Sequence, residues 1–229
     1  FQAEDGIRDF LLSLVGSEMC IRDREMGGFS YMEFVVPGLI MMAIVTNSYS
    51  NVVSSFFGSK FNHSVEELLV SPTPNYVILM GYVLGGVSRG LLVAVVVTLV
   101  SLFFTRLHIH SYFVVIVIVL MTSTLFALAG FINAVYANSF DDISIIPTFV
   151  LTPLIYLGGV FYSMDLLPDF WAGVSKLNPL VYVVNAFRYG VLGVSDVSLG
   201  FAFGMIALFT VIAFTYCMHL LNSGKRLRQ

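Results

Sequence analysis

Charged residues are scarce in this chain of 229 residues. They make up 11% of it, against about 25% in an average soluble protein. Two cysteines are too few for a framework of disulfides. The net charge of −3 supplies no basic surface for a nucleic acid. We therefore expect neither a soluble globular domain, nor a disulfide-stabilised scaffold, nor a nucleic-acid partner.

Sequence motifs for binding nucleotides or metals are also missing. The sequence has no G-x-x-x-x-G-K-[ST] loop with which to hold a triphosphate. It has no H-E-x-x-H pair, and His108 and His110 lack the further ligands that a tetrahedral zinc site needs. We expect no metal, no cofactor bound by this chain and no catalytic residue. Any energy source then lies outside the chain.

What the chain has in abundance is apolar sequence. It is 58% hydrophobic, with a mean hydropathy of +0.90. Five apolar runs have about twenty residues or more, which is the length that crosses a hydrocarbon core of roughly 30 Å as a helix. We expect an all-α integral membrane fold with several spans. The expected spans are 34–57, 77–104, 111–137, 143–162 and 199–221.

The stretch from Pro147 to Gly190 does not fit a simple pattern of spans. An uncharged run to about Tyr162 is followed by a short segment with its apolar residues on one helical face, and then by a second apolar run, Leu180–Leu192. This second run has about thirteen residues, too few to cross the bilayer, and it contains Arg188. Backbone that dips into a membrane needs protein or water around it. We therefore predict short re-entrant or interfacial helices before the last span, sheltered by the bundle.

The first 24 residues differ from the rest of the chain. They hold five acidic and three basic residues, and their longest apolar stretch, Phe10 to Val15, is too short to span. They also lack the basic start and long apolar core of a signal peptide. The segment resembles translated sequencing-adaptor sequence. We interpret residues 1–24 as non-native, with a mobile polar tail as the alternative, and residues 25–229 as the membrane domain.

A short helix is predicted in the loop after the first span. Ser64 and Glu67 fit the capping-box spacing, which predicts a helix that begins at about Val65. Pro72 and Pro74 end it after about two turns. Isolated helices of this length are marginal in water, so its apolar face must rest on the bundle or on a partner.

The span 77–104 contains glycines at helical spacing and one arginine. Gly81/Gly85 and Gly86/Gly90 form two small-xxx-small pairs, which allow another helix to approach closely. Arg89 lies beside them, and a charge inside a membrane faces the bundle interior or water, or extends to the interface. Both interpretations of Arg89 stay open at this point.

Several separated blocks of sequence carry a family resemblance. In chain order they are GGFSYMEFVVPGLIMM, SSFFGSKF, EELLVSP, GYVLGGVSRGL, FDDISIIPTFVLTP, LTPLIYLGGVFYSMDLLPDFW and LNPLVYVVNAFRYG. From about Glu25 to the C-terminus the chain resembles the ABC-2 type export permeases of bacteria, the membrane subunits of ATP-driven exporters.

The resemblance implies a type V exporter-like bundle that retains five of six transmembrane helices, the first being absent here. It also implies a homodimer in the bacterial inner membrane and a separate ABC ATPase subunit that binds the ATP and Mg²⁺. A groove of that ATPase would receive a coupling helix, which maps onto Ser64, Val65, Glu66, Glu67, Leu68 and Leu69.

Candidates for the translocation route or an interface are Arg89, Tyr156, Phe161, Tyr162, Trp171 and Arg188. Related permeases export drugs, polysaccharides and lipid-linked glycans, and the sequence does not choose among these substrates. Two functions of other classes remain as alternatives. One is a membrane-embedded enzyme acting on lipid, with Asp141, Asp142 or Arg89 in its site. The other is a channel or transporter that works without ATP.

Overall fold

The fold is that of a computed structural model, which describes residues 25–26, 29–103, 109–161, 173, 175, 178–195 and 197–223. The first 24 residues, Tyr162, Trp171 and most of the predicted amphipathic segment before α9 lie outside this description, as does the side chain of Leu69.

The described chain is almost entirely helical. A small hairpin of β1 and β2 pairs Glu25 with Ser30 and Met26 with Phe29, and leads directly into α2. The elements in order are β1 Glu25–Met26, β2 Phe29–Ser30, α2 Tyr31–Phe61, α3 Ser64–Val70, α4 Asn75–Ser101, α5 Tyr112–Tyr136, α6 Phe140–Ile146, η1 Pro147–Leu151, α7 Thr152–Tyr156, α9 Pro179–Leu192 and α10 Leu199–Ser223.

Four helices in the described part of the chain are long and apolar enough to cross a membrane: α2, α4, α5 and α10. They coincide with four of the five expected spans, and the all-α membrane architecture is confirmed. The share of buried residues differs strongly among them. In α2 and α5 about half of the most apolar window is buried (56%), whereas in α10 the buried share is 17%. Hence α2 and α5 form the interior, whereas α10 leaves most of its surface exposed.

The fifth expected span, 143–162, is not one regular helix. The structure forms three consecutive segments instead, α6, the π-helical η1 and α7. Proline explains the break, because Pro147 and Pro153 have no N–H for the carbonyl four residues earlier. The Ile143 carbonyl freed by Pro147 accepts a hydrogen bond from Asn133 Nδ2 of α5 at 3.3 Å. The Thr152 hydroxyl donates to the Pro147 carbonyl at 2.9 Å, across the wider π turn.

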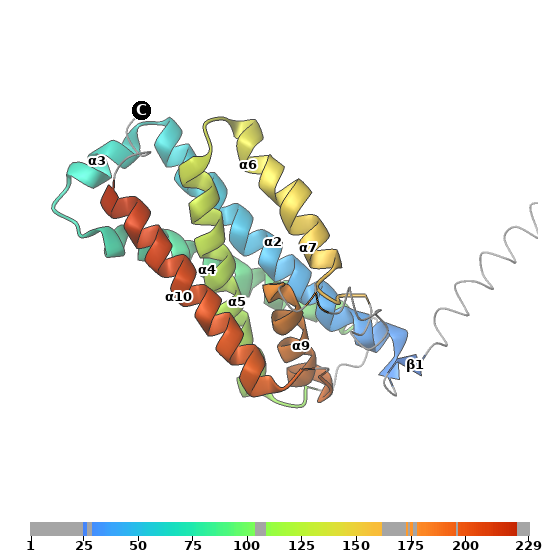
Figure 1. The fold of residues 1–229 in the computed structure, drawn as a ribbon. Helices are drawn as coiled ribbons and strands as arrows, with labels where there is room; N and C mark the ends of the chain where they lie inside the picture. Colours follow the sequence, from blue (N-terminus) through green and yellow to red (C-terminus); the bar gives the residue numbers. More distant parts are fainter. Residues whose placement is uncertain are drawn as a thin grey trace, which may run out of the picture.

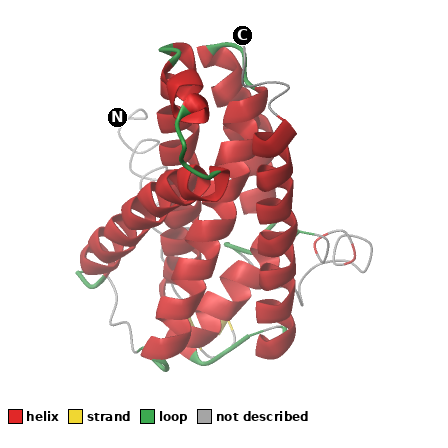
Figure 2. Ribbon diagram, turned by 90° about the vertical axis from the view of Figure 1, so that its left-hand side faces the viewer, coloured by secondary structure: helices red, strands yellow, loops and turns green. Residues whose placement is uncertain are grey.

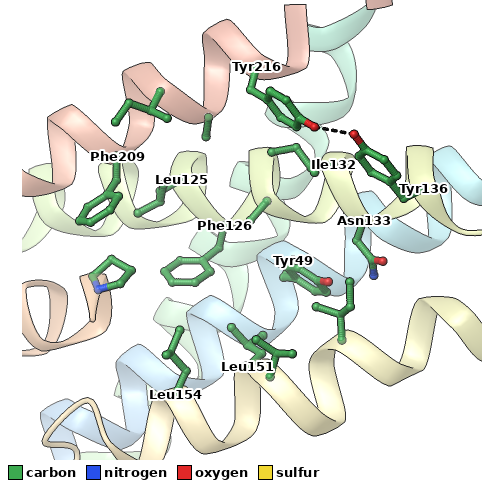
Figure 3. Close-up of a pocket in the computed structure, with 16 residues that line it drawn as sticks. Tyr49, Leu125, Phe126, Ile132, Asn133, Tyr136, Leu151, Leu154, Phe209 and Tyr216 are labelled. Carbon is green, nitrogen blue, oxygen red and sulfur yellow. Dashed lines mark hydrogen bonds between the residues drawn. The ribbon is translucent and has the colours of Figure 1, made fainter. Parts of the chain in front are cut away.

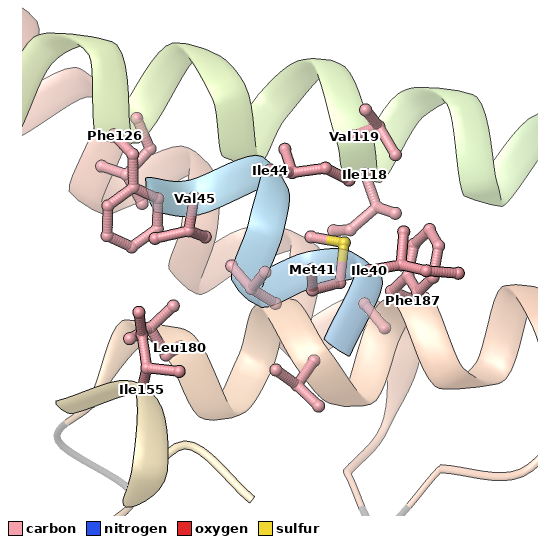
Figure 4. Close-up of a cluster of buried hydrophobic side chains, with 14 of the residues drawn as sticks. Ile40, Met41, Ile44, Val45, Ile118, Val119, Phe126, Ile155, Leu180 and Phe187 are labelled. Carbon is pink, nitrogen blue, oxygen red and sulfur yellow. The ribbon is translucent and has the colours of Figure 1, made fainter. Parts of the chain in front are cut away.

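Helix α2 is the centre of the bundle. It packs most extensively against α5 and α4, and also contacts α9. Ile40, Met41, Ile44 and Val45 of α2 are almost completely buried. Figure 4 shows them between side chains of α5 on one side and of α7 and α9 on the other. The element that is too short to span therefore shares one core with the long helices.

The two ends of the bundle carry different short elements. Helix α3, the start of α6 and the end of α10 gather at one end, whereas α9 and the hairpin lie towards the other (Figure 1). Most of the long helices run along the length of the molecule between these ends, whereas one, α4, slants away from the others (Figure 2). A side-chain hydrogen bond of 2.8 Å between Asn75 and Asn222 joins the start of α4 to the end of α10. We call the end of the bundle that carries α3 the α3 end.

The glycines of α4 divide between two faces. A Cβ atom on Gly86 would lie 2.6 Å from Val52 Cγ2 and 3.0 Å from Ala127 Cβ, so α2 and α5 both approach α4 closely at this residue. Gly90 is equally confined, between the hydroxyl groups of Ser48 and Ser123. In contrast, a Cβ atom on Gly81 would meet nothing within 4 Å. Only the second of the two predicted small-residue pairs, Gly86/Gly90, is thus a helix contact within the described chain.

Candidate functional site

Helix α3 forms as predicted but begins differently. It ends at Val70, before Pro72 and Pro74. The predicted capping box of Ser64 and Glu67 is wrong, because Ser64 is already the first helical residue and His63 takes the N-cap position with a left-handed backbone (φ 58°). The chain needs this left-handed residue because it turns sharply out of α2 within Asn62 and His63.

One apolar side chain anchors α3 on the bundle. Val65 is 2% exposed and packs in the cluster that contains Phe56 and Phe57 of α2. Burial of such a side chain contributes about 1.5–3 kcal/mol. Leu68 and Val70 point away from the bundle, with 37% and 85% of their surface exposed. The helix therefore sits on the α3 end with apolar surface still uncovered.

Lys60, close to the turn into α3, links α2 to the end of α5. Its Nζ donates to the carbonyls of Val135 at 3.1 Å and Ala137 at 2.9 Å, and its side chain is buried. These carbonyls lie in the last turn of α5, where a cation also interacts favourably with the helix dipole. The sequence analysis did not identify this role of Lys60. The signal available was one lysine at the end of an apolar run.

Asp142 caps the start of α6, which also lies at the α3 end of the bundle. Its Oδ2 accepts hydrogen bonds from the N–H groups of Asn138 at 3.0 Å and Ser139 at 3.1 Å, and the Ser139 hydroxyl accepts the N–H of Asp142. The bond from Asn138, followed by those with Ser139, holds the pKa of Asp142 below its usual range. Asp142 therefore caps the N-terminus of α6. This capping provides a structural reason for Asp142 without lipid chemistry.

Helix α9 is the sheltered element that the sequence predicts between Leu180 and Leu192. It has 14 residues, or about 21 Å at 1.5 Å per residue, which is less than the bilayer core. Every residue from Leu180 to Arg188 is buried. A helix this short exposes orphan backbone groups at both ends inside the membrane region, and these groups need partners.

The start of α9 is held by Asn178. Its side-chain oxygen accepts the N–H of Leu180 at 2.9 Å, as an N-cap does. Its Nδ2 donates to the carbonyl of Leu154 in α7 at 2.7 Å. One asparagine thus satisfies the helix start and ties it to the preceding helix.

The segment before α5 satisfies the other end of α9. The N–H of His110 donates to the Val191 carbonyl at 3.2 Å, and the N–H of Ser111 donates to the Gly190 carbonyl at 2.9 Å. Gly193 ends the helix in a left-handed conformation (φ 78°), and its N–H donates to the Tyr189 carbonyl. The His110 ring stacks edge-on against Tyr189. His110 is therefore a packing residue, while His108 lies outside the described chain.

Arg188 points into the protein and not into an open route. It is 1% exposed, and its Nη2 donates to the Gly159 carbonyl at 2.9 Å. Its guanidinium carbon lies 3.7 Å from the centre of the Phe34 ring. Arg188 therefore joins α9 to the turn after α7 and to the first turn of α2.

Arg89 has the opposite environment. It lies fourteen residues after Asn75, where α4 begins, and twelve before Ser101, where α4 ends. Its side chain is exposed on the surface of this single chain, and Nη1 contacts Asn51 Oδ1 of α2 at 3.4 Å. Both interpretations of Arg89, facing a route or extending to the interface, remain predictions.

The aromatic route candidates are only partly described. Tyr156 and Phe161 stack on one another with their ring centres 5.5 Å apart, at the end of α7. Tyr162 and Trp171 lie outside the described residues. The structure therefore does not bring all six candidates into one cluster. Arg188 and Arg89 have separate environments.

The described structure supports neither a serine-hydrolase site nor a metal site. Residues 86–90 spell G-x-S-x-G, a match that sequence reasoning passed over, but they lie in the middle of α4 and not at a strand-to-helix turn. The Ser88 hydroxyl donates to the Gly85 carbonyl of its own helix at 2.9 Å. Within the described chain no three histidine, cysteine, aspartate or glutamate side chains gather as metal ligands would.

Comparison with known proteins agrees with this architecture. The sequence model of the ABC-2 type transporter family matches residues 8–192. The match begins inside the first 24 residues, whose interpretation as non-native stays a prediction.

Among curated proteins, the inner membrane transport permease YadH of Escherichia coli K12 is 55% identical over 216 residues, which cover 94% of this chain and 83% of that protein. YadH of Shigella flexneri matches equally well. Nodulation protein J of Rhizobium leguminosarum bv. viciae is 21% identical over 209 residues, covering 91% of this chain and 81% of that protein. The chain therefore belongs to the ABC-2 type transporter family, as a multi-pass transport permease of the inner membrane.

Proposed function

We propose that this chain is the permease subunit of an ATP-driven exporter and that α3 couples it to a separate ATPase subunit. The observation that carries the proposal is the seating of α3. Val65 fixes the helix to the bundle, while Leu68 and Val70 remain exposed at the end of the molecule. Exposed apolar side chains on a helix that is anchored by its other face fit a partner's groove. ATP and Mg²⁺ bind to the partner.

The connections of α3 provide a route for movement. The turn at Asn62 and His63 joins α3 to α2, the helix with the largest contacts in the bundle. Lys60, just before this turn, holds the end of α5 through two hydrogen bonds. A displacement of α3 therefore acts on α2 and α5 together. Through the shared core it reaches α9 at the opposite end.

The active unit in this proposal is a homodimer. Arg89 and Asn51 are polar side chains near the middle of membrane-length helices, on a face that this single chain leaves uncovered. A charged side chain at that depth is unfavourable against lipid and requires protein or water beside it. A second copy of the chain, with a water-filled route between the copies, supplies both.

The coupling role is tested by placing charge on the exposed face of α3. The permease is co-purified with the ATPase encoded beside it and reconstituted in proteoliposomes, where ATP hydrolysis and export are measured. We expect Leu68→Asp together with Val70→Asp to abolish stimulation of the ATPase while membrane insertion is unchanged. Phe103→Asp, at an apolar residue just after α4 that is 88% exposed, is the control. Unchanged stimulation in the double variant would remove the role proposed for α3.

A further inference from the structure

A cavity of about 530 Å³ lies between α2, α5, α10 and the broken helix of α6, η1 and α7. Figure 3 shows it with its lining side chains. The volume is within the range of about 300–1,000 Å³ that is typical of small-molecule sites. None of the side chains that the structure places on its wall is charged. It is separate from α3 and from Arg89.

The polar groups of the cavity gather at one end. Tyr136 and Tyr216, whose hydroxyl groups are hydrogen-bonded to each other, lie there with Asn133 and Tyr49. Leu154 and Phe209 line the opposite end, and Pro179 at the start of α9 also belongs to the wall. The polar end faces the α3 end of the bundle, because Tyr136 and Tyr216 lie near the ends of α5 and α10. The cavity is thus polar at one end and apolar at the other, as an amphiphilic molecule is.

The Tyr49 hydroxyl is the unusual group at the polar end. Tyr49 is 3% exposed, and its hydroxyl has no hydrogen-bond partner among the described residues. The Asn133 side chain lies on the same side of the cavity, and its Nδ2 donates to the Ile143 carbonyl at 3.3 Å. A buried hydroxyl without a partner is unfavourable by about 1–3 kcal/mol. An acceptor brought into the cavity would satisfy it.

The exposure of the rim residues locates the opening. On one side Ile146 and Val150 are 37% and 54% exposed, and on the other Ile212 and Tyr216 are 54% and 41% exposed. The opening therefore runs between the broken helix and α10. Because α10 is the span with the least buried surface, this gap faces the hydrocarbon of the bilayer.

We propose that the cavity binds one acyl chain of a bilayer phospholipid. The chain enters between α10 and η1, its ester lies at the Tyr49 and Asn133 end, and its tail extends towards Pro179. A neutral apolar chain matches the uncharged wall, and an ester carbonyl is an acceptor for the Tyr49 hydroxyl. If α3 meets an ATPase, the α3 end is cytoplasmic and the bound lipid belongs to the inner leaflet. This assignment to a leaflet rests on the proposed coupling role of α3, whereas the binding itself does not.

The proposal is tested with a photoreactive lipid. The permease is reconstituted in nanodiscs of phosphatidylethanolamine and phosphatidylglycerol that contain a phosphatidylethanolamine with a diazirine in one acyl chain. Labelled peptides are mapped by mass spectrometry. We expect label on the cavity side of α10, around Phe209 and Ala213. Ala213→Phe, which fills the cavity, should remove most of it, whereas the lipid-facing control Leu208→Phe should leave it unchanged.

A second comparison does not depend on filling the cavity. Tyr49→Phe removes one hydroxyl and should lower labelling by an ester-linked probe about five-fold, the equivalent of one hydrogen bond. An ether-linked probe lacks the carbonyl and should label both proteins equally.

Three outcomes would overturn the proposal. Label that spreads over both faces of α10 and ignores Ala213→Phe would mean boundary lipid without a site. Equal loss of both probes on Tyr49→Phe would exclude the ester contact. Efficient disulfide formation between two copies of Ile212→Cys, with Cys20 and Cys217 replaced by serine, would show that a second chain covers the opening.

Discussion

Arg188 is the largest side chain that the described bundle buries completely. A buried guanidinium is stable only when hydrogen bonds and aromatic surface replace its water, and here the Gly159 carbonyl and the Phe34 ring contribute to that role. Lys60 is likewise buried against two carbonyls. At the scale of single residues, both cations join segments that are far apart in the sequence.

Arg188→Leu should therefore destabilise the permease. It leaves the Gly159 carbonyl without this donor and removes the cation–π contact, for a loss of about 2–4 kcal/mol in unfolding free energy. Arg188→Lys should recover less than half of the loss, because an ammonium lacks the planar guanidinium that covers Phe34. Thermal unfolding in detergent measures both, with the exposed Arg89→Lys as control. Equal melting temperatures for Arg188→Leu and wild type would contradict this assignment.

The two glycine pairs of α4 yield a matched comparison. Gly86→Ala forces a methyl group to 2.6 Å from Val52 Cγ2 and should destabilise the bundle by about 1–3 kcal/mol. Gly81→Ala meets nothing and should stay within about 1 kcal/mol of wild type. Unfolding by denaturant in mixed micelles compares the two variants. A larger loss of stability in Gly81→Ala than in Gly86→Ala would mean that α4 packs against the bundle through its Gly81 face and not through its Gly86 face.

Among the elements, α9 shows how a helix too short to cross is kept in the membrane region. Asn178 satisfies its first turn, while the N–H groups of His110 and Ser111 satisfy its last carbonyls. Shelter for this segment could be predicted from its length alone. These partners could not, because they come from parts of the chain that only the tertiary fold brings together.

Accessibility labelling examines the shelter of α9 directly. Val183→Cys and Ala186→Cys, both completely buried, should stay unreactive towards a membrane-impermeant maleimide in intact membranes. Val194→Cys, just beyond the helix and 37% exposed, should react readily. Free reactivity throughout α9 would mean that the segment lies in water, and the architecture described above would fail.

For the molecule as a whole, the sequence predicts the spans well because twenty apolar residues have few other stable arrangements. It predicts less well those features that depend on the local backbone conformation, such as helix ends and helix breaks. The capping box at Ser64 failed because the sharp exit from α2 places His63 at the N-cap. The span 143–162 broke because Pro147 and Pro153 each remove a hydrogen-bond donor. The roles of Lys60 and Arg188 depend on partners far along the chain.

The proposed homodimer belongs to this scale as well. With Cys20 and Cys217 replaced by serine, Ser88→Cys beside Arg89 should form a disulfide between two copies in native membranes. Leu208→Cys, on the lipid-facing side of α10, should not. Non-reducing gel electrophoresis separates the two results. Cross-linking through Leu208→Cys alone would move the interface to α10 and leave Arg89 without the neighbour proposed for it.

The dependence of α9 on Asn178, His110 and Ser111 also bears on biosynthesis. A segment of 14 residues is too short for the insertion machinery to release into the bilayer as an independent span. Its hydrogen-bond partners in α7 and before α5 leave the ribosome earlier than α9 itself. We therefore expect α9 to enter the membrane region only after those helices have assembled, and a mutation that delays their pairing to leave α9 exposed for longer.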